Sequence, residues 1–241
     1  MAGHSAWKNM KHRKAAVDAK RGKLWSKASR AIIVAARLGG GDVRFNSSLR
    51  MAIDEAKWVN MPRDTIEKAV KKGSGTLEGD DYQAIRYEGY GAGGVAVIAE
   101  CLTSNINRTA PEIRTIFDKN YGNLGVMGSV SYNLRHAGVL MVERARIGEE
   151  QLMEIVLAAG ADDVVADEEM WQVSCAPGVL AAVRDALEAA GTAVTEAQVI
   201  WIPSTPIEVH GERAAQVLKL IDALEEHDDV QKVFSNAIFS E

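Results

Sequence analysis

Cysteine and long apolar runs are both scarce in this sequence. Only two of its 241 residues are cysteines, Cys101 and Cys175, and they lie far apart inside apolar segments. Two isolated thiols supply neither a disulfide framework nor a zinc-binding set. No apolar run approaches the roughly 20 residues that a membrane-spanning helix needs, and residues 1–20 lack the apolar stretch of a secretory signal. We therefore expect a globular cytoplasmic protein with reduced thiols and no membrane partner.

Motifs for catalysis and for cofactor binding are also missing. The five histidines form no His-Glu-x-x-His pair, and the chain has neither a Gly-x-Ser-x-Gly elbow nor a phosphate loop ending in Gly-Lys-Ser/Thr. The run of four acids and a histidine at 225–229 predicts a solvated turn rather than a metal site, because five consecutive side chains cannot all face one ion. We expect a protein that is not an enzyme, with no catalytic residue, metal, cofactor or small-molecule substrate.

The glycines at 89–94 match the spacing of a dinucleotide-binding fingerprint. That fingerprint needs a helix N-terminus after it to receive the pyrophosphate, whereas the strand-like residues 95–102 follow here. The segment therefore predicts a glycine-rich turn between two strands.

Acidic residues are rare near the N-terminus, and basic residues are concentrated there. Residues 1–77 hold 17 Lys and Arg against 6 Asp and Glu, a balance of +11, although the whole chain has a net charge of −5. Residues 78–241 hold 11 against 27, a balance of −16. This asymmetry indicates a basic module that meets a polyanion and an acidic body that repels it. An organellar transit peptide is an alternative explanation for so basic a start.

Residues 1–77 predict a bundle of three helices. Apolar residues recur at spacings of three and four across 15–38, 46–59 and 62–73. Asn46 offers an N-cap for the second helix, and Pro62 suits the first turn of the third. The polar segment 73–81 has the composition of a flexible linker and marks the end of this domain.

The basic residues of this bundle are the candidate nucleic-acid-binding residues. On the first helix the cations lie on one side and Leu24, Ala28 and Ile32 on another, so one face packs while the other meets phosphate. Upstream, further cations crowd around Trp7, whose ring is able to stack on an unpaired base. The predicted contact residues are Trp7, Lys8, Lys11, His12, Arg13, Lys14, Lys20, Arg21, Lys23, Lys27 and Arg30. A solvated charged face on helices that only pack is the alternative.

After the linker, strands alternate with helices. Strands are predicted at 82–88, 94–102, 128–135, 138–143, 163–166, 170–175, 194–202, 205–209 and 230–238, and helices at 109–120, 149–159, 177–190 and 212–226. Residues 138–202 follow the order of a ferredoxin-like unit, and the flanking pieces follow the same order. We predict an α+β fold in which an N-terminal three-helix domain (1–77) precedes two ferredoxin-like α/β domains, one (137–203) inserted in the other (82–136 plus 204–241). A tandem arrangement is the rival topology.

A secondary anion site is possible at the start of the helix predicted from Thr109. Asn105, Asn107 and Arg108 precede a Thr109-x-x-Glu112 capping box, and amide and guanidinium groups at a helix N-terminus suit an anion. Ordinary turn chemistry explains the asparagines equally well.

Five segments of the chain strongly resemble the YebC/PmpR family in order and spacing. They are AGHSAWKNMKHRKAAVDAKRGK, NMPRDTIEKAVKKG, YEGYGAGGVAVIAECLTSNINRTAPEIRTIF, GNLGVMGSVSY and HDDVQKVFSNA. Bacterial members are usually described as probable transcriptional regulators, and mitochondrial relatives as translational activators of cytochrome oxidase. The resemblance spans almost the whole chain. It implies an N-terminal helical domain, two α/β domains, a cytoplasmic location and no cofactor.

Two functions remain open for the basic domain. The first is a DNA-binding transcriptional regulator, which needs side chains that read base edges in the major groove. The second is a ribosome-associated translation factor that binds ribosomal or transfer RNA and relieves stalling, for example at proline-rich stretches. Backbone charge and a stackable Trp7 suit structured RNA. A protein-binding adaptor that uses the acidic domains is a third class.

Overall fold

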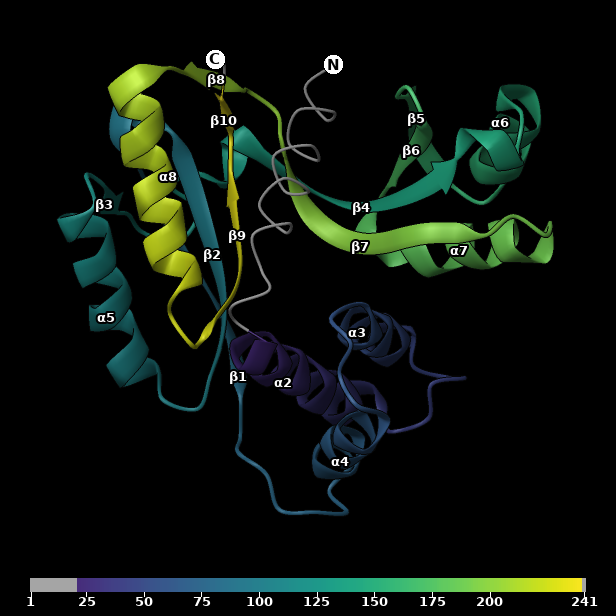
Figure 1. Cartoon of the computed structure of the whole chain (residues 1–241), viewed down its shortest axis with the longest axis horizontal. Helices are drawn as coiled ribbons and strands as arrows, with labels where there is room; N and C mark the ends of the chain where they lie inside the picture. The colour runs from purple at the N-terminus through teal and green to yellow at the C-terminus, as the bar shows by residue number, and fades with distance from the viewer. Residues whose placement is uncertain (1–20, 240–241) are drawn as a thin grey trace.

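The computed structural model describes residues 21–239 (Figure 1). Its first part, which we call the helical domain, is a bundle of three helices: α2 (Arg21–Gly39), α3 (Ser47–Trp58) and α4 (Arg63–Gly73). Ile32, Leu49 and Ile66, one from each helix, are buried together in its core. Gly73 brings α4 close to α2, because a Cβ at this position would lie 2.4 Å from the backbone oxygen of Ile33. The three helices predicted from apolar spacing are confirmed in the described residues.

Asn46 fixes the turn between α2 and α3. Its side-chain oxygen accepts a hydrogen bond from the backbone N–H of Leu49, as an N-cap does. Its amide nitrogen donates to the backbone oxygens of Ala35 and Gly40, at 2.8 Å each. One buried side chain therefore supplies hydrogen-bond partners for backbone oxygens at the end of α2 and for a backbone N–H at the start of α3.

The second part, the outer α/β domain, is built from two separated stretches of chain. Its elements are β1 (Gln83–Tyr90), β2 (Ala96–Thr103), α5 (Ile106–Lys119) and β3 (Asn123–Leu124), followed much later by β8 (Ile207–Val209), α8 (Gly211–Glu225), β9 (Val230–Ser235) and β10 (Ala237–Phe239). The main sheet has the order β3-β1-β2-β9, with every neighbouring pair antiparallel. This is the ferredoxin-like order, but β1 occupies the place of the third strand. The strand expected there, β8, instead pairs in parallel with β10.

The third part, the inserted α/β domain, lies between β3 and β8 in the sequence. It consists of β4 (Leu134–Glu143), α6 (Glu149–Ala158), β5 (Ala161–Ala166), β6 (Met170–Cys175), α7 (Leu180–Ala189) and β7 (Val194–Pro203). The sheet order β5-β6-β4-β7, all antiparallel, is that of a ferredoxin-like unit. The predicted α+β fold class, with one α/β domain inserted in the other, is confirmed, and the tandem topology is wrong. The exact domain boundaries stay a prediction.

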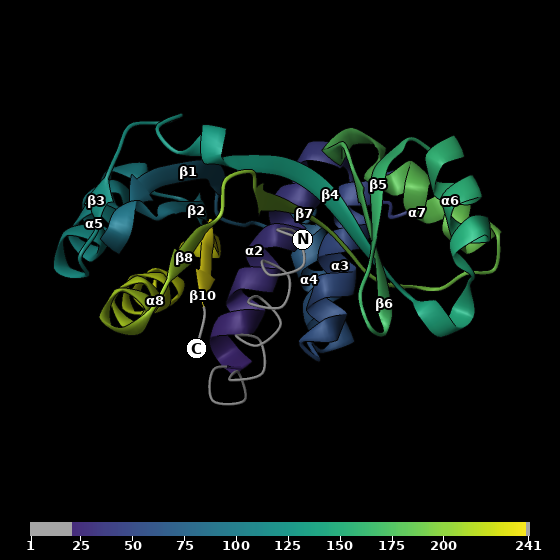
Figure 2. The same cartoon turned by 90° about the horizontal axis from the view of Figure 1, so that it is seen from above.

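The two sheets face each other across an apolar layer. Ile98 and Phe234 of the outer sheet pack with Val139 and Trp201 of the inserted sheet. Helices α5 and α8 cover the opposite face of the outer sheet, and α6 and α7 cover that of the inserted sheet (Figures 1 and 2). The helical domain lies beneath the junction of the two (Figure 1). Within residues 21–239, no helix combines the length and apolar character needed to cross a membrane.

Three local predictions are corrected by the structure. The strand predicted at 128–135 is wrong, because 131–133 form a short 3₁₀ turn and β4 runs without a break from Leu134 to Glu143. The Thr109-x-x-Glu112 capping box is also wrong, since α5 begins three residues earlier, with Asn105 as its N-cap. Pro62 is the N-cap of α4 rather than a first-turn residue. The glycine-rich segment 89–94 does join two antiparallel strands, as predicted; 92–94 form a short 3₁₀ turn that leads into β2, and no α-helix begins there to receive a pyrophosphate.

Candidate nucleic-acid interface

Helix α2 carries three of its basic residues in one row. Lys23, Lys27 and Arg30 are spaced by four and then three residues, which places them on the same side of a helix. Ala28 and Ile32 are buried in the bundle core on another side. We call Lys23, Lys27 and Arg30 the basic row of α2; all three belong to the predicted nucleic-acid-binding residues.

The basic row contacts a segment nearly 200 residues away in the sequence. This segment, residues 225–229, connects α8 to β9, and we call it the acidic turn. Lys23 donates to the backbone oxygen of Glu226, and its Nζ lies 3.4 Å from the carboxylate of Glu226 and 3.5 Å from that of Asp228. Lys27 donates to the backbone oxygen of Glu225 at 2.8 Å. The predicted phosphate-binding side chains therefore already have oxygen partners inside the protein.

Asp229 is the buried centre of this contact. Its side chain is 3% exposed, and its Oδ1 lies 3.3 Å from Nη1 of Arg30. Its Oδ2 accepts hydrogen bonds from Arg108 and, at 2.7 Å, from the hydroxyl of Thr109. Burial pushes the pKa of Asp229 upward, but the hydrogen bonds from Thr109, Arg108 and Thr103 outweigh it, so the pKa lies below its ordinary value. Asp229 is thus a stable carboxylate that links the helical domain to α5.

Lys27 is a partly buried cation of the row. Burial lowers its pKa from 10.5 to about 8, against the opposing effect of the nearby Glu225 carboxylate. The ammonium group has therefore lost hydration that its neighbours only partly replace. A phosphate oxygen would compensate this charge more fully than a backbone carbonyl does.

An open cleft separates the basic row from α5 at the same junction. It has a volume of about 710 Å³, and its walls include Lys23, Arg30, Arg108, Glu112 and Asp228. The contact between α2 and the acidic turn is therefore polar and incompletely packed. Within the part of the chain that the structure describes, no group of three or more His, Cys, Asp or Glu side chains is placed to hold a metal ion.

The predicted secondary anion site lies at the start of α5. Asn105 accepts a hydrogen bond from the backbone N–H of Arg108 at 3.1 Å, as the N-cap, and Asn107 is exposed. The guanidinium of Arg108 contacts the carboxylates of Asp229 and Glu112. Its positive charge is therefore already balanced by carboxylates in this conformation. Anion binding at these residues stays a prediction.

Several predicted contact residues lie outside residues 21–239. They are Trp7, Lys8, Lys11, His12, Arg13, Lys14 and Lys20, and the described residues do not include them. Arg21 is the first residue of α2, and the description covers only its backbone.

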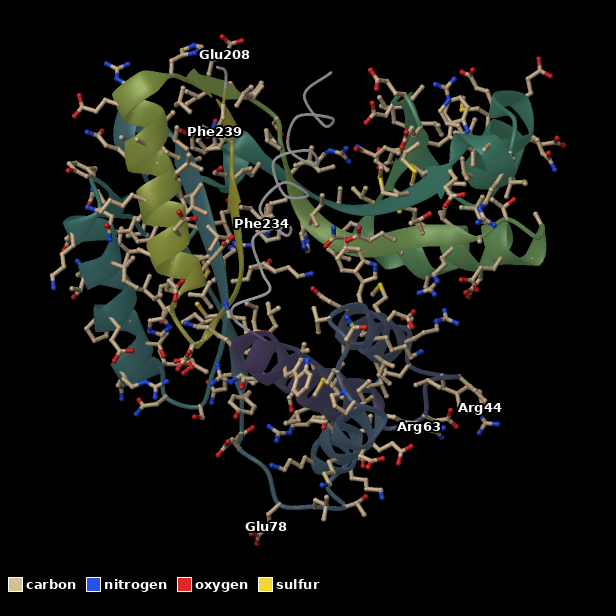
Figure 3. The ribbon with its side chains drawn as sticks, viewed as in Figure 1. Arg44, Arg63, Glu78, Glu208, Phe234 and Phe239 are labelled. Atoms are coloured by element: carbon tan, nitrogen blue, oxygen red, sulfur yellow. The ribbon has the colours of Figure 1, made fainter. Side chains whose placement is uncertain are left out.

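The residue-level prediction did not include the lysines of α4. Lys68, Lys71 and Lys72 are exposed, and none of them forms an ion pair with a carboxylate among residues 21–239. The helical period that places Ile66 and Ala69 on the buried side of α4 leaves these lysines on the exposed side. The sequence pattern that identified the basic row of α2 could therefore have identified them too. At the domain's outer edge, Arg44 stacks over the exposed ring of Phe45, with 5.5 Å from the guanidinium carbon to the ring centroid. Figure 3 shows Arg44 directed away from the rest of the molecule.

Fold and charge together define a class of protein. It is a three-domain α+β protein in which a basic helical domain precedes two nested ferredoxin-like domains. Family models give this class its name. Residues 5–76 match the N-terminal domain of TACO1/YebC proteins, and residues 82–237 match their second and third domains. The chain belongs to the TACO1/YebC family, as the sequence resemblance predicted.

Curated relatives and a solved structure agree with this assignment. A Ralstonia nicotianae protein, named "probable transcriptional regulatory protein", is 50% identical over 242 residues and is matched over 100% of both chains. A Persephonella marina protein of the same description is 49% identical, with 98% of this chain and 95% of its own covered. The crystal structure of a conserved hypothetical protein from Aquifex aeolicus, 46% identical, superposes with a TM-score of 0.80 over 93% of each chain.

Proposed function

We propose that this protein is a non-enzymatic regulator of gene expression that binds nucleic acid through its helical domain. The observation that carries the proposal is the separation of charge, +11 in residues 1–77 and −16 in residues 78–241. A basic domain gains binding free energy when its cations displace the counterions of a phosphate backbone. The acidic body orients the encounter, because it repels the same backbone. The names of the relatives, probable transcriptional regulatory proteins, support a regulatory role.

DNA is the partner that these names favour, and RNA is the alternative that the helices favour. Helices α2, α3 and α4 contain no Asn or Gln, the residues that pair with adenine in the major groove. Their outward cations suit phosphates, and phosphates position a protein without specifying sequence. Structured RNA is recognised largely through shape and backbone contacts. This composition supports a second candidate function, a ribosome-associated factor that binds ribosomal or transfer RNA.

One experiment separates these candidates. The protein is crosslinked to nucleic acid in living cells, purified under denaturing conditions, and the bound nucleic acid is sequenced. Recovery of promoter DNA without ribosomal or transfer RNA supports the transcriptional regulator and rejects the translation factor. Recovery of ribosomal or transfer RNA without DNA supports the translation factor and rejects the transcriptional regulator. A crosslinked fraction with no more nucleic acid than an uncrosslinked control contradicts nucleic-acid binding altogether.

A further inference from the structure

We propose that the acidic turn, residues 225–229, competes with nucleic acid for the basic row of α2. In the conformation that the structure shows, the row is covered, and nucleic acid uses it only after the helical domain moves away from the turn. This inference rests on the proposed function and adds a mode of regulation to the same site.

The chemistry of the covered row supports competition. Lys23, Lys27 and Arg30 donate to backbone oxygens of Glu226, Glu225 and Asp228 in turn. Carboxylates of Glu226, Asp228 and Asp229 lie beside them. The anionic oxygens of a phosphate backbone accept hydrogen bonds from the same Lys and Arg N–H groups. A hydrogen that is donated to the turn is not available to a phosphate, and the turn also occupies the space beside these cations, so the two acceptors compete.

The contact is weak enough to open. The side chains of Glu226 and Asp228 are 50% and 75% exposed, and exposed ion pairs contribute little to stability. The pair of Arg30 with the buried Asp229 is the part of the contact that costs most to break. An open cleft of about 710 Å³ adjoins the contact, so the two surfaces are incompletely packed there. The lowered pKa of Lys27 indicates that the turn compensates this cation poorly. To reach the basic row, nucleic acid therefore has to displace a polar contact with the acidic turn and does not have to unfold a packed core.

A second polar contact holds the helical domain on the body. Arg50 of α3 pairs with Asp185 of α7 at 2.9 Å, and Arg184 pairs with Asp54 at the same distance. Lys232 of β9 lies 3.3 Å from Glu55. The chain between α4 and β1 is exposed from Ser74 to Asp81, with Gly75 at φ 78°. Movement of the helical domain about this exposed segment breaks these polar contacts and the packing of Met51 against the inserted domain, and it leaves the bundle core intact.

The turn keeps its shape when the helical domain leaves. Asp229 remains bound to Arg108 and Thr109 of α5, and the ring of His227 lies 2.9 Å from the carboxylate of Glu112. The competing oxygens are therefore preorganised on the body and rebind the basic row without further ordering. The lysines of α4 stay exposed in both arrangements and supply the residual binding expected of the closed form.

The test locks the helical domain on the body. Arg50→Cys and Asp185→Cys are introduced together, and the pair is joined with a short bismaleimide; the same variant capped with N-ethylmaleimide is the matched control. Cys101 and Cys175 are 2% and 0% exposed, so the reagents are directed to the new thiols. Affinity for a labelled DNA duplex and for a labelled RNA hairpin is measured by anisotropy. We expect the locked protein to bind about 5- to 10-fold more weakly than the capped protein. This is the effect expected when about two cations are prevented from exchanging the acidic turn for phosphate.

The outcomes distinguish this inference from the proposed function. Equal affinity of locked and capped protein overturns the competition while nucleic-acid binding stands. Absence of binding by every form, wild type included, overturns the proposed function instead. A second comparison protects against misfolding of the cysteine variant: Glu226→Gln with Asp228→Asn is expected to tighten binding about fivefold relative to Glu208→Gln with Glu212→Gln, which changes the net charge equally at the far end of α8. Equal affinities there also contradict the competition.

Discussion

Arg30 and Asp229 join the helical domain to the outer α/β domain. Nη1 of Arg30 lies 3.3 Å from Oδ1 of Asp229, whose side chain is 3% exposed. The second carboxylate oxygen is bound by Arg108 and Thr109. Because one buried carboxylate serves two elements, its loss removes a buried acceptor from polar groups of both α2 and α5.

Removing this carboxylate is expected to destabilise the protein. Asp229→Ala should lower the free energy of unfolding by about 2 kcal/mol, since it removes a buried acceptor shared by the hydroxyl of Thr109 and the guanidinium groups of Arg30 and Arg108. Asp228→Ala, at a side chain 75% exposed, should change it by less than about 0.5 kcal/mol. Urea unfolding of the two variants beside wild type measures both values. Equal losses would show that Asp229 has no special role at the junction.

Lys27 makes the free energy of unfolding depend on pH, and the lowered pKa of its amine fixes the direction of this dependence. The folded protein releases the Lys27 proton near pH 8, whereas the unfolded chain keeps it up to about pH 10.5. Between these values the unfolded state binds more protons, so the stability contribution of Lys27 rises with pH. Lys27→Met should therefore be more stable than wild type by about 1–2 kcal/mol at neutral pH, and the difference should shrink above pH 8. Urea unfolding across this range checks it, and a difference that stays constant with pH contradicts the burial of a charged amine.

The two cysteines are expected to be unreactive in the native protein. Burial raises the pKa of Cys101 to about 12 and that of Cys175 to about 11, so neither forms the nucleophilic thiolate near pH 8. Labelling with Ellman's reagent should be slow in buffer and rapid for both thiols in denaturant. Rapid labelling of either thiol in the native protein would place it at a mobile or exposed position.

Elements governed by local sequence were predictable, and choices of partner strand were not. The helices of the bundle follow from apolar spacing and from Asn46, which is adjacent in sequence to the helix that it caps. The sequence predicts separate strands at 128–135 and 138–143, but β4 runs from Leu134 to Glu143 and pairs with β7 along nearly all of that length. The place of β1 in the outer sheet depends on its pairing with β2, a long-range choice of partner that the residues of β1 and β8 do not reveal by themselves.

The candidate site divides in the same way. The basic row of α2 is visible in the sequence because helical period sets which residues share a side. The contact between this row and the acidic turn cannot be predicted from the sequence, because the turn lies nearly 200 residues away and only the fold brings it to Lys23 and Arg30. The acidic run at 225–229 was predicted to be a solvated turn. It is a turn, but Asp229 is buried and paired.

The central proposal, that the basic N-terminal domain binds a phosphate backbone, is tested most directly by the salt dependence of binding. With six to ten phosphate contacts, affinity for a nonspecific duplex or hairpin should fall by about 10³ to 10⁵ between about 50 and 200 mM salt. The variant with Lys11, Arg13, Lys20 and Lys27 all changed to Glu should lose both binding and most of this slope. The matched control changes four exposed cations of the body to Glu: Arg114, Lys119, Arg213 and Lys219. This control changes the net charge by the same amount as the N-terminal variant. It should retain at least part of the nucleic-acid binding, with a salt dependence equal to that of wild type. The same affinity and slope in the N-terminal variant and wild type would contradict the assignment of the interface to this domain.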